Sequence, residues 1–341
     1  MSNRIKKLFN LIKRIYINND YTLDDSKGFY ASSTFLRRNV IFFYEIGCFF
    51  QKQKFKFLAD FMFSVPYLFF SLFGLRNLSF SQICYLFNSD KSLAIDKEKK
   101  FTNLAFTLAD NYDRFFYRIK NKKLKILEIG IGGHDNPNLG GSSLRSLSKF
   151  FNRSEIFGID IIDKKPHERK RIKTFLGSQM NKNFLEEVSK EYGPFDIIID
   201  DGSHYVDHQI HSFNILFPFL NDNGMYFIED MLSSYMKYMG GSINIDNEKN
   251  LVSKFSKISH SVYSEYILID ELKKLKQSIP ISSMLFFCKN GKGCIFIEKA
   301  ENREDGRYTT PEHKLSMDDI KKSNPDHKLN RKSPSGVFST K

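Results

Sequence analysis

Cysteine is scarce in this sequence, and the few residues present are not paired. The four cysteines stand at positions 48, 84, 288 and 294, and no two of them form a CxxC motif. This spacing argues against a disulfide framework and against a zinc knuckle. We therefore expect a protein of the reducing cytoplasm.

Long uncharged apolar runs are also missing. A membrane-spanning helix needs about 20 consecutive apolar residues, and the most apolar stretch, residues 57–75, contains Asp60 and Pro66. We expect this stretch to form a buried pair of helices interrupted at Pro66. Residues 1–7 are basic, but no apolar segment with a small-residue cleavage site follows them, so no secretory signal is expected.

Acidic residues are outnumbered, and the positive excess is uneven. The formal net charge is +13, and many of the lysines and arginines lie within the first 56 residues. No DNA- or RNA-binding motif accompanies them, so we expect no nucleic-acid partner. The charge fits either a solvated face or peripheral contact with an anionic surface, such as the inner face of the membrane.

The composition changes along the chain and predicts four parts. They are a flexible basic arm (1–30), a helical N-terminal region (31–118), a main α/β domain (119–300) and a flexible polar tail (301–341). In the helical region apolar residues recur at three- and four-residue spacing. We expect its phenylalanines, Phe57 and Phe61 among them, to lie in a core.

Strands alternate with helices from residue 124 onward. Strands are predicted at 124–128, 156–160, 172–176, 195–200 and 225–229, with helices at 142–151, 183–192 and 206–220. Such alternation implies parallel strands joined by helical crossovers, and therefore a doubly wound sheet.

Two further apolar runs end this pattern. Residues 284–288 and 294–298 flank a turn rich in Asn and Gly, which predicts an antiparallel hairpin. A mostly parallel sheet finished by such a hairpin is the Rossmann-like arrangement of class I methyltransferases.

Two of the predicted strands end in acidic pairs. Asp200 and Asp201 are followed by Gly202, Ser203 and His204, and a second pair, Glu229 and Asp230, closes the run 225–228. Strand ends on one side of a parallel sheet converge on the ligand crevice, so we expect both pairs to meet there.

The residue types in this set allow more than one chemistry. Asp201, Glu229 and Asp230 offer hard oxygen ligands that suit Mg²⁺, although acids after strands also cap helices. His204 could take a proton from an alcohol. His208 lies one helical turn further on, which leaves a zinc pair as an alternative, but no third soft ligand is suitably spaced.

The first strand leads into a glycine turn. Its sequence contains Glu128, Gly130 and Gly132 but no GxGxxG fingerprint, so a carboxylate that holds the amino group of a methionine moiety fits better than a pyrophosphate site. Asp160 ends the second strand, where it could accept hydrogen bonds from ribose hydroxyls. Gln179 is placed to touch an adenine edge or the amino acid end, unless it is an ordinary loop residue.

At this point the sequence resembles a known family, the macrocin and mycinamicin type of sugar O-methyltransferase, whose members are class I enzymes that use S-adenosylmethionine and Mg²⁺. The resemblance rests on LEIGIGGHDNPNLGGSSLRSL (127–147), IFGIDIIDK (156–164), RIKTFLGSQ (171–179), GPFDIIIDDGSH (193–204) and LFPFLNDNGMYFIED (216–230). It covers about residues 120–300.

The resemblance implies a role for each matching residue. Magnesium would be bound by Asp201, Glu229 and Asp230, and His204 would be the general base. The S-adenosylmethionine pocket would be lined by Glu128, Gly130, Gly132, Asp160, Gln179 and Asp200, and the loop 134–141 would lie over the active site. Upstream, the family's GTDKG motif corresponds to residues 88–92, which read NSDKS and lack both glycines.

The expected activity is therefore methylation of a sugar hydroxyl in a surface polysaccharide or a glycosylated metabolite. A homo-oligomer is compatible with this expectation. Two alternatives stay open, an oxidative enzyme like the cephalosporin hydroxylases on the same fold, and a non-catalytic assembly protein at a membrane surface.

Overall fold

The computed structural model describes residues 78–87, 89–92, 108–245, 247, 249–263, 270–289 and 292–300, together with scattered helical positions between 39 and 65. The predicted basic arm and polar tail lie outside these residues. Among the residues described, no helix is both long and apolar enough to cross a membrane.

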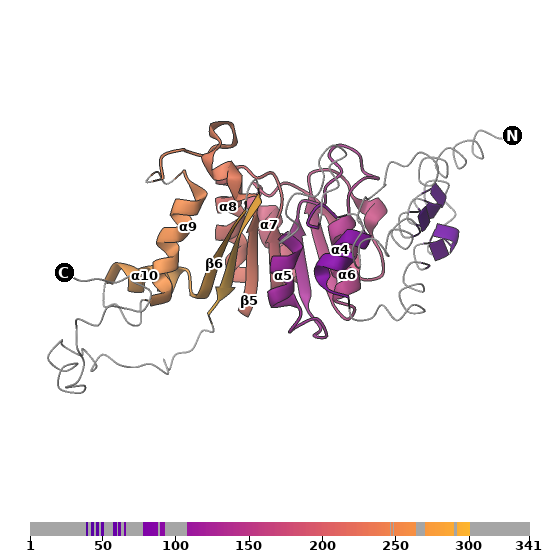
Figure 1. The fold of residues 1–341 in the computed structure, drawn as a ribbon, viewed down its shortest axis with the longest axis horizontal. Helices are drawn as coiled ribbons and strands as arrows, with labels where there is room; N and C mark the ends of the chain where they lie inside the picture. The colour runs from indigo at the N-terminus through magenta and orange to yellow at the C-terminus, as the bar shows by residue number, and fades with distance from the viewer. Residues whose placement is uncertain are drawn as a thin grey trace, which may run out of the picture.

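A single seven-stranded sheet organises the fold (Figure 1), in the order β3-β2-β1-β4-β5-β7-β6. The strands are β1 (Lys125–Ile129), β2 (Glu155–Asp160), β3 (Ile172–Leu176), β4 (Phe195–Asp200), β5 (Leu220–Glu229), β6 (Ile281–Lys289) and β7 (Lys292–Lys299). Strands β1 to β5 run parallel to one another, and β7 pairs antiparallel with both β5 and β6. The predicted class I methyltransferase arrangement, with its closing hairpin, is confirmed.

Helices connect the strands. The α-helices are α4 (Phe80–Leu86), α5 (Leu108–Phe116), α6 (Ser142–Phe150), α7 (Lys182–Tyr192), α8 (Val206–Leu216), α9 (Leu251–Ser259) and α10 (Asp270–Ser278). Short 3₁₀ helices are η2 (Lys165–His167), η3 (Phe217–Phe219), η4 (Met231–Tyr235), η5 (Lys237–Met239) and η6 (His260–Tyr263). The sequence predicted α6, α7 and α8 and all seven strands to within about five residues, except that Leu220 begins β5 and does not end α8. It did not predict α9, α10 or the short 3₁₀ helices.

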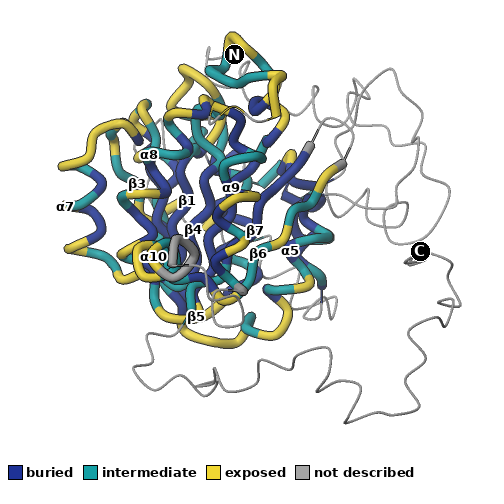
Figure 2. Tube along the Cα trace, turned by 90° about the vertical axis from the view of Figure 1, so that its left-hand side faces the viewer, coloured by how far each residue is buried: buried dark blue, intermediate teal, exposed yellow. Residues whose placement is uncertain are grey.

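The central strands β1 and β4 are buried on both faces, as Figure 2 shows by their dark colour between the helices. Along β4, Ile197 and Ile199 belong to one core cluster, which they share with α4, α5 and α6. Ile198 between them belongs to the other cluster, with α7, α8 and α9. Alternate side chains of a strand point to opposite faces, so a run of three isoleucines supplies both layers of the core.

The helices α4 and α5 are part of this core and do not form a separate layer. The ring centroids of Tyr112 and Phe227 lie 4.5 Å apart, and those of Phe115 and Phe296 lie 3.9 Å apart. The carboxylate of Asp113 also accepts hydrogen bonds from the first backbone N–H groups of α4. The division predicted at residue 118 therefore runs through a shared core and is corrected.

Further upstream, the predicted phenylalanine core is only partly supported. Ala59 is buried, but the side chain of Phe57 is 82% exposed and that of Phe61 is 54% exposed. Three- and four-residue spacing defines an apolar helix face without saying what covers it. The expectation that these two phenylalanines are buried is wrong, and the predicted helix pair over 57–75 lies largely outside the described residues.

Candidate active site

A cleft of about 660 Å³ opens at the carboxyl ends of the parallel strands. Its walls include most of the predicted site residues, namely Gly130, Gly132, Asp160, Gln179, Asp201 and His204. Glu128 and Asp200 do not reach the surface of the cleft, because their side chains are fully buried beneath it. These predicted residues thus lie at one end of the sheet, some on the surface of the cleft and others buried below it.

The glycine turn after β1 forms the floor of the cleft. Gly130 has a φ of +87° and Gly132 a φ of +74°, values that glycine adopts without strain. A Cβ atom on residue 130 would overlap the carbonyl oxygen of Asp201. The turn can therefore lie against the end of β4 only because residue 130 has no side chain.

Asp160 links the two loops at the ends of β1 and β2. One of its carboxylate oxygens accepts a hydrogen bond from the N–H of Ile131, and the other accepts one from the N–H of Ile162, both at 2.9 Å. The side chain is partly exposed and lines the cleft. Since each carboxylate oxygen has a second lone pair, the residue can hold the loops and still accept hydrogen bonds from a ligand.

Gln179 is a buried connector. Its amide nitrogen donates to Ser212 Oγ at 2.8 Å and to Asp200 Oδ1 at 3.3 Å. Its oxygen accepts from the N–H of Ser203 at 2.9 Å. The interpretation of Gln179 as an ordinary loop residue is therefore wrong, because all of these contacts orient the segment that follows β4.

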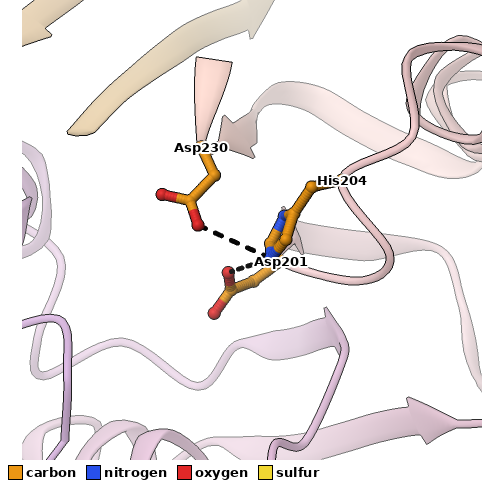
Figure 3. A group of neighbouring side chains, drawn as sticks. All are labelled: Asp201, His204 and Asp230. Carbon is orange, nitrogen blue, oxygen red and sulfur yellow. Dashed lines mark ion pairs between the residues drawn. The ribbon is translucent and has the colours of Figure 1, made fainter. Parts of the chain in front are cut away.

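Asp201, His204 and Asp230 converge beside the cleft (Figure 3). His204 Nε2 lies 3.5 Å from Asp230 Oδ2 and 4.0 Å from Asp201 Oδ1. One ligand atom from each residue lies within 4.8 Å of the others, a spacing that suits a metal ion. The two carboxylates are hard oxygen donors of the kind that Mg²⁺ prefers, and the imidazole beside them can accept a proton.

His204 and Asp230 both have left-handed backbones, with φ values of +60° and +54°. Such conformations are uncommon for residues other than glycine and cluster at functional sites. They turn the two side chains toward each other at the points where their strands end, which local preference alone would not do.

Neither alternative chemistry for this cluster appears in the described residues. The side chain of Asp230 makes no capping hydrogen bond to η4, and α8 begins after Tyr205, four residues beyond Asp201. His208 Nδ1 faces Ser203 Oγ at 2.7 Å and lies outside the cluster. Helix capping and a zinc pair of His204 with His208 are both set aside.

Glu229 lies next to this cluster but has different partners. Its Oε1 atom accepts a hydrogen bond from Tyr112 at 2.5 Å and lies 2.7 Å from Lys91 Nζ. Burial and the neighbouring carboxylate of Asp201 raise the pKa of Glu229 to about 8, against the opposing effect of Lys91. Glu229, the predicted third metal ligand, is thus positioned by its contacts with Lys91 and Tyr112, which both precede the sheet in the sequence.

Like Tyr112, Lys91 is a site residue that the sequence did not reveal. Its buried ammonium lies 2.6 Å from Asp201 Oδ2 and 3.3 Å from Glu128 Oε1, in addition to its contact with Glu229. Burial alone would lower the pKa of Lys91, but these carboxylates raise it well above its ordinary value. The available signal was the DK pair of residues 88–92, which the resemblance matched without giving it a role.

The other two buried carboxylates hold their protons more tightly than usual. Burial raises the pKa of Glu128 to about 7, although Lys91 and Ser143 oppose the shift. Burial also raises the pKa of Asp200 to about 7. In the described part of the chain, Glu128 Oε2 and Asp200 Oδ2 are buried without a hydrogen-bond partner. Buried oxygen atoms normally have such a partner, so a ligand with hydrogen-bond donors or positive charge would be stabilised at this end of the sheet.

Two side chains, those of Lys164 and His167, fix the loop 134–141 beside the cleft. Lys164 Nζ donates to the carbonyl oxygens of His134, Asn136 and Leu139 at 3.0–3.2 Å. His167 Nε2 lies 3.1 Å from the carbonyl oxygen of Pro137. The backbone of a loop rich in Asn, Pro and Gly is thereby held in one conformation.

Comparison with known proteins finds methyltransferases that are similar to part of this chain. The chain is 46% identical over 131 residues to the mycinamicin VI 2''-O-methyltransferase of Micromonospora griseorubida and 47% identical over 131 residues to the demethylmacrocin O-methyltransferase of Streptomyces fradiae. Each match covers 38% of this chain and 33% of the relative. No family model matches the chain.

A methyltransferase of known structure has a similar fold. The MycE methyltransferase of mycinamycin biosynthesis, in complex with Mg and SAH, aligns with a TM-score of 0.59 at 30% identity, over 72% of this chain and 59% of that one. The same enzyme with mycinamycin VI also bound aligns with a TM-score of 0.56.

The chain spans about a third of the length of the curated relatives it matches. The resemblance indicated by the motifs is confirmed over the matched segment, where the chain is similar to sugar O-methyltransferases of the macrocin and mycinamicin type and has the class I methyltransferase fold.

Proposed function

We propose that this protein transfers a methyl group from S-adenosylmethionine to a sugar hydroxyl in a Mg²⁺-dependent reaction. The observation that carries the proposal is the convergence of Asp201, His204 and Asp230 beside the glycine-lined cleft. Relatives named as sugar O-methyltransferases, and a structural neighbour that contains Mg and SAH, support it.

The cleft fits a positively charged cofactor. Three strand-end carboxylates, those of Glu128, Asp201 and Glu229, surround Lys91, and the carboxylate of Asp230 lies on the far side of Asp201 beside His204, so carboxylates outnumber the one ammonium in this cluster of described residues. The sulfonium and amino groups of S-adenosylmethionine would offset part of it. We assign Glu128, Gly130, Gly132, Asp160, Gln179 and Asp200 to this half of the site.

The outer carboxylates fit a hard divalent ion. Asp201 Oδ1 and Asp230 Oδ2 both face the partly exposed ring of His204, and oxygen donors of this kind suit Mg²⁺. Glu229 remains a candidate ligand through the oxygen that Lys91 and Tyr112 leave free. A bound Mg²⁺ would act as a Lewis acid and as a template for the acceptor hydroxyl.

His204 is the group proposed to accept the proton. Its Nε2 atom faces the two carboxylates, which would stabilise the imidazolium form that results. The acceptor oxygen forms a bond to the methyl carbon while the bond from that carbon to sulfur breaks, and the hydroxyl proton passes to His204. The products are a methyl ether and S-adenosylhomocysteine. Alignment of the two reacting groups by the cleft supplies much of the acceleration.

The acceptor is proposed to be a sugar on a glycosylated molecule. One relative is named for a rhamnosyl group on tetracenomycin C, and two others are named for mycinamicin VI and demethylmacrocin. The surface-polysaccharide acceptor and the membrane contact predicted from the basic N-terminus stay predictions, because most of residues 1–77 lies outside the described part of the chain.

The test is methyl transfer from labelled S-adenosylmethionine to a panel of rhamnosides, macrolide glycosides and polysaccharide precursors. We expect transfer with Mg²⁺, loss with EDTA and recovery when Mg²⁺ is restored. Asp230→Asn should lose activity, and Asp207→Asn, which alters an exposed carboxylate of α8, should not.

Full activity in EDTA would refute the metal requirement. Absence of S-adenosylmethionine binding, with iron-dependent oxygen uptake in its place, would favour the hydroxylase alternative.

A further inference from the structure

Lys91 lies at the centre of the acidic end of the sheet. Its side chain is 1% exposed and contacts carboxylates from three different strand ends, at 2.6 Å for Asp201, 2.7 Å for Glu229 and 3.3 Å for Glu128. An ammonium has three N–H groups and no acceptor. Each N–H group of Lys91 thus has one carboxylate within reach.

The backbone around Lys91 is fixed by the helices on either side. The N–H of Ala109, in α5, donates to the carbonyl oxygen of Lys91 at 2.9 Å. Ser89, two residues earlier, donates its N–H to the carbonyl oxygen of Cys84 in α4 at 2.8 Å. The position of the ammonium is therefore set by α4 and α5, and the lysine is an integral part of the site.

The carboxylate oxygens of this cluster fall into two groups. We call those that contact the buried Lys91 the inner side, and those that face the partly exposed His204 the outer side. On the inner side, Lys91 contacts Asp201 Oδ2 and Glu229 Oε1, and Tyr112 donates to the same Glu229 oxygen. On the outer side, Asp201 Oδ1 faces His204, whose Nε2 also faces Asp230. One carboxylate, that of Asp201, belongs to both sides through its two oxygens.

We propose that Lys91 acts as a resident cation that occupies the inner side of this cluster and confines a divalent ion to the outer side. Without it, the inner oxygens of Asp201 and Glu229 would attract the divalent ion away from His204 and Asp230. Two cations cannot share these oxygens at contact distance, because like charges repel strongly in a buried site. Lys91 is thus a positioning residue for the metal and contacts no reacting atom.

The inference deepens the proposed function, since it concerns the same site, but it is tested on metal affinity and not on methyl transfer. Lys91→Met keeps most of the side-chain volume and removes the charge. It removes the ammonium from three carboxylate oxygens and leaves one unit of negative charge uncompensated, so Mg²⁺ should bind about tenfold more tightly or better to the variant. The variant should also unfold at a lower temperature without metal, because its buried carboxylates lose their counter-ion.

The experiment compares metal-stripped wild-type and variant proteins. Titration calorimetry with MgCl₂ gives the affinity, and thermal unfolding with EDTA or with MgCl₂ gives the stabilisation by the ion. Lys164→Met is the matched control, because Lys164 is also buried but donates only to carbonyl oxygens of the loop 134–141 among the contacts described. It should lose stability without any gain in Mg²⁺ affinity.

The outcomes separate the inference from the proposed function. Tighter Mg²⁺ binding by Lys91→Met supports the inference, even if no acceptor sugar is ever methylated. Equal or weaker binding than wild type overturns it, even if the enzyme is an active methyltransferase. Should Lys91→Met fail to fold in EDTA, the double variant with Glu229→Gln, which removes one uncompensated carboxylate, must regain folding. Failure of the double variant to fold with or without Mg²⁺ also overturns the inference.

Discussion

Gly130 lies so close to the backbone of Asp201 that no side chain fits between them. The contact brings the turn after β1 and the end of β4 together, and these are the two segments that form the floor of the cleft. Gly130→Ala should therefore destabilise the protein and weaken cofactor binding, since either the carbonyl of Asp201 or the turn must move.

Gly240 offers a matched control for this variant. Its φ of +79° is close to the +87° of Gly130, but a Cβ atom there would meet nothing within 4 Å. Gly240→Ala should cost about 1 kcal/mol through backbone strain alone, and Gly130→Ala should cost clearly more. Urea denaturation measures both free energies of unfolding, and equal losses would show that the contact with Asp201 is unimportant.

Stability should fall in mild acid because of His167. Burial, with the charges of Arg145, Arg169 and Lys164, lowers the pKa of this histidine to about 3. The folded protein then binds fewer protons than the unfolded chain below pH 6.5, where a free histidine becomes charged. The contribution of His167 to the free energy of unfolding is largest above pH 6.5, where the residue is neutral in both states. As the pH falls from 6.5 toward 3, this contribution decreases, by about 2 kcal/mol at pH 5.

His167→Gln separates this effect from the other titrating groups. Glutamine keeps a donor for the carbonyl of Pro137 but carries no ionisable ring. Denaturation of both proteins at pH 7 and pH 5 should show that the variant loses about 2 kcal/mol less than wild type over this interval. Parallel losses in the two proteins would mean that His167 is protonated as easily in the folded state as in the unfolded one.

The sequence predicted that Asp201, His204 and Asp230 would lie together, as they do, while their roles stay predictions. Asp201, His204 and Asp230 follow strands whose apolar pattern is plain, and the ends of parallel strands must meet. Lys91 could not be placed in the same way. It lies in a short irregular segment, 110 positions before Asp201, where no periodicity reports a long-range contact. Tyr112 was hidden for another reason, since its ring belongs to an ordinary amphipathic helix face and only its hydroxyl reaches the site.

The two histidines that follow β4 should differ sharply in their effect on catalysis. His204→Ala should lower kcat by about 10²-fold or more, the usual effect of removing a general base, while the affinity for S-adenosylmethionine changes little. His208→Ala should lower kcat by less than about tenfold, because His208 contacts Ser203 and lies outside the cluster. Steady-state kinetics and calorimetry measure these quantities. A similar loss of activity in both variants would revive the zinc pair.

Two buried tyrosines test the hydrogen bond to Glu229. Tyr112 donates to the Glu229 carboxylate at 2.5 Å, whereas the buried hydroxyl of Tyr226 has no partner among the described residues. Above the raised pKa of Glu229, about 8, the acceptor is a charged carboxylate, and a hydrogen bond to a charged group contributes about 1.5–3 kcal/mol, whereas removal of an unpaired buried hydroxyl costs little or stabilises. The two variants are therefore compared with wild type by denaturation at pH 9. Tyr112→Phe should therefore lower the free energy of unfolding by about 2 kcal/mol, and Tyr226→Phe should leave it unchanged or raise it. Because both substitutions delete one oxygen from a buried ring, the difference isolates the contact with Glu229, and equal effects would show that the carboxylate does not depend on Tyr112.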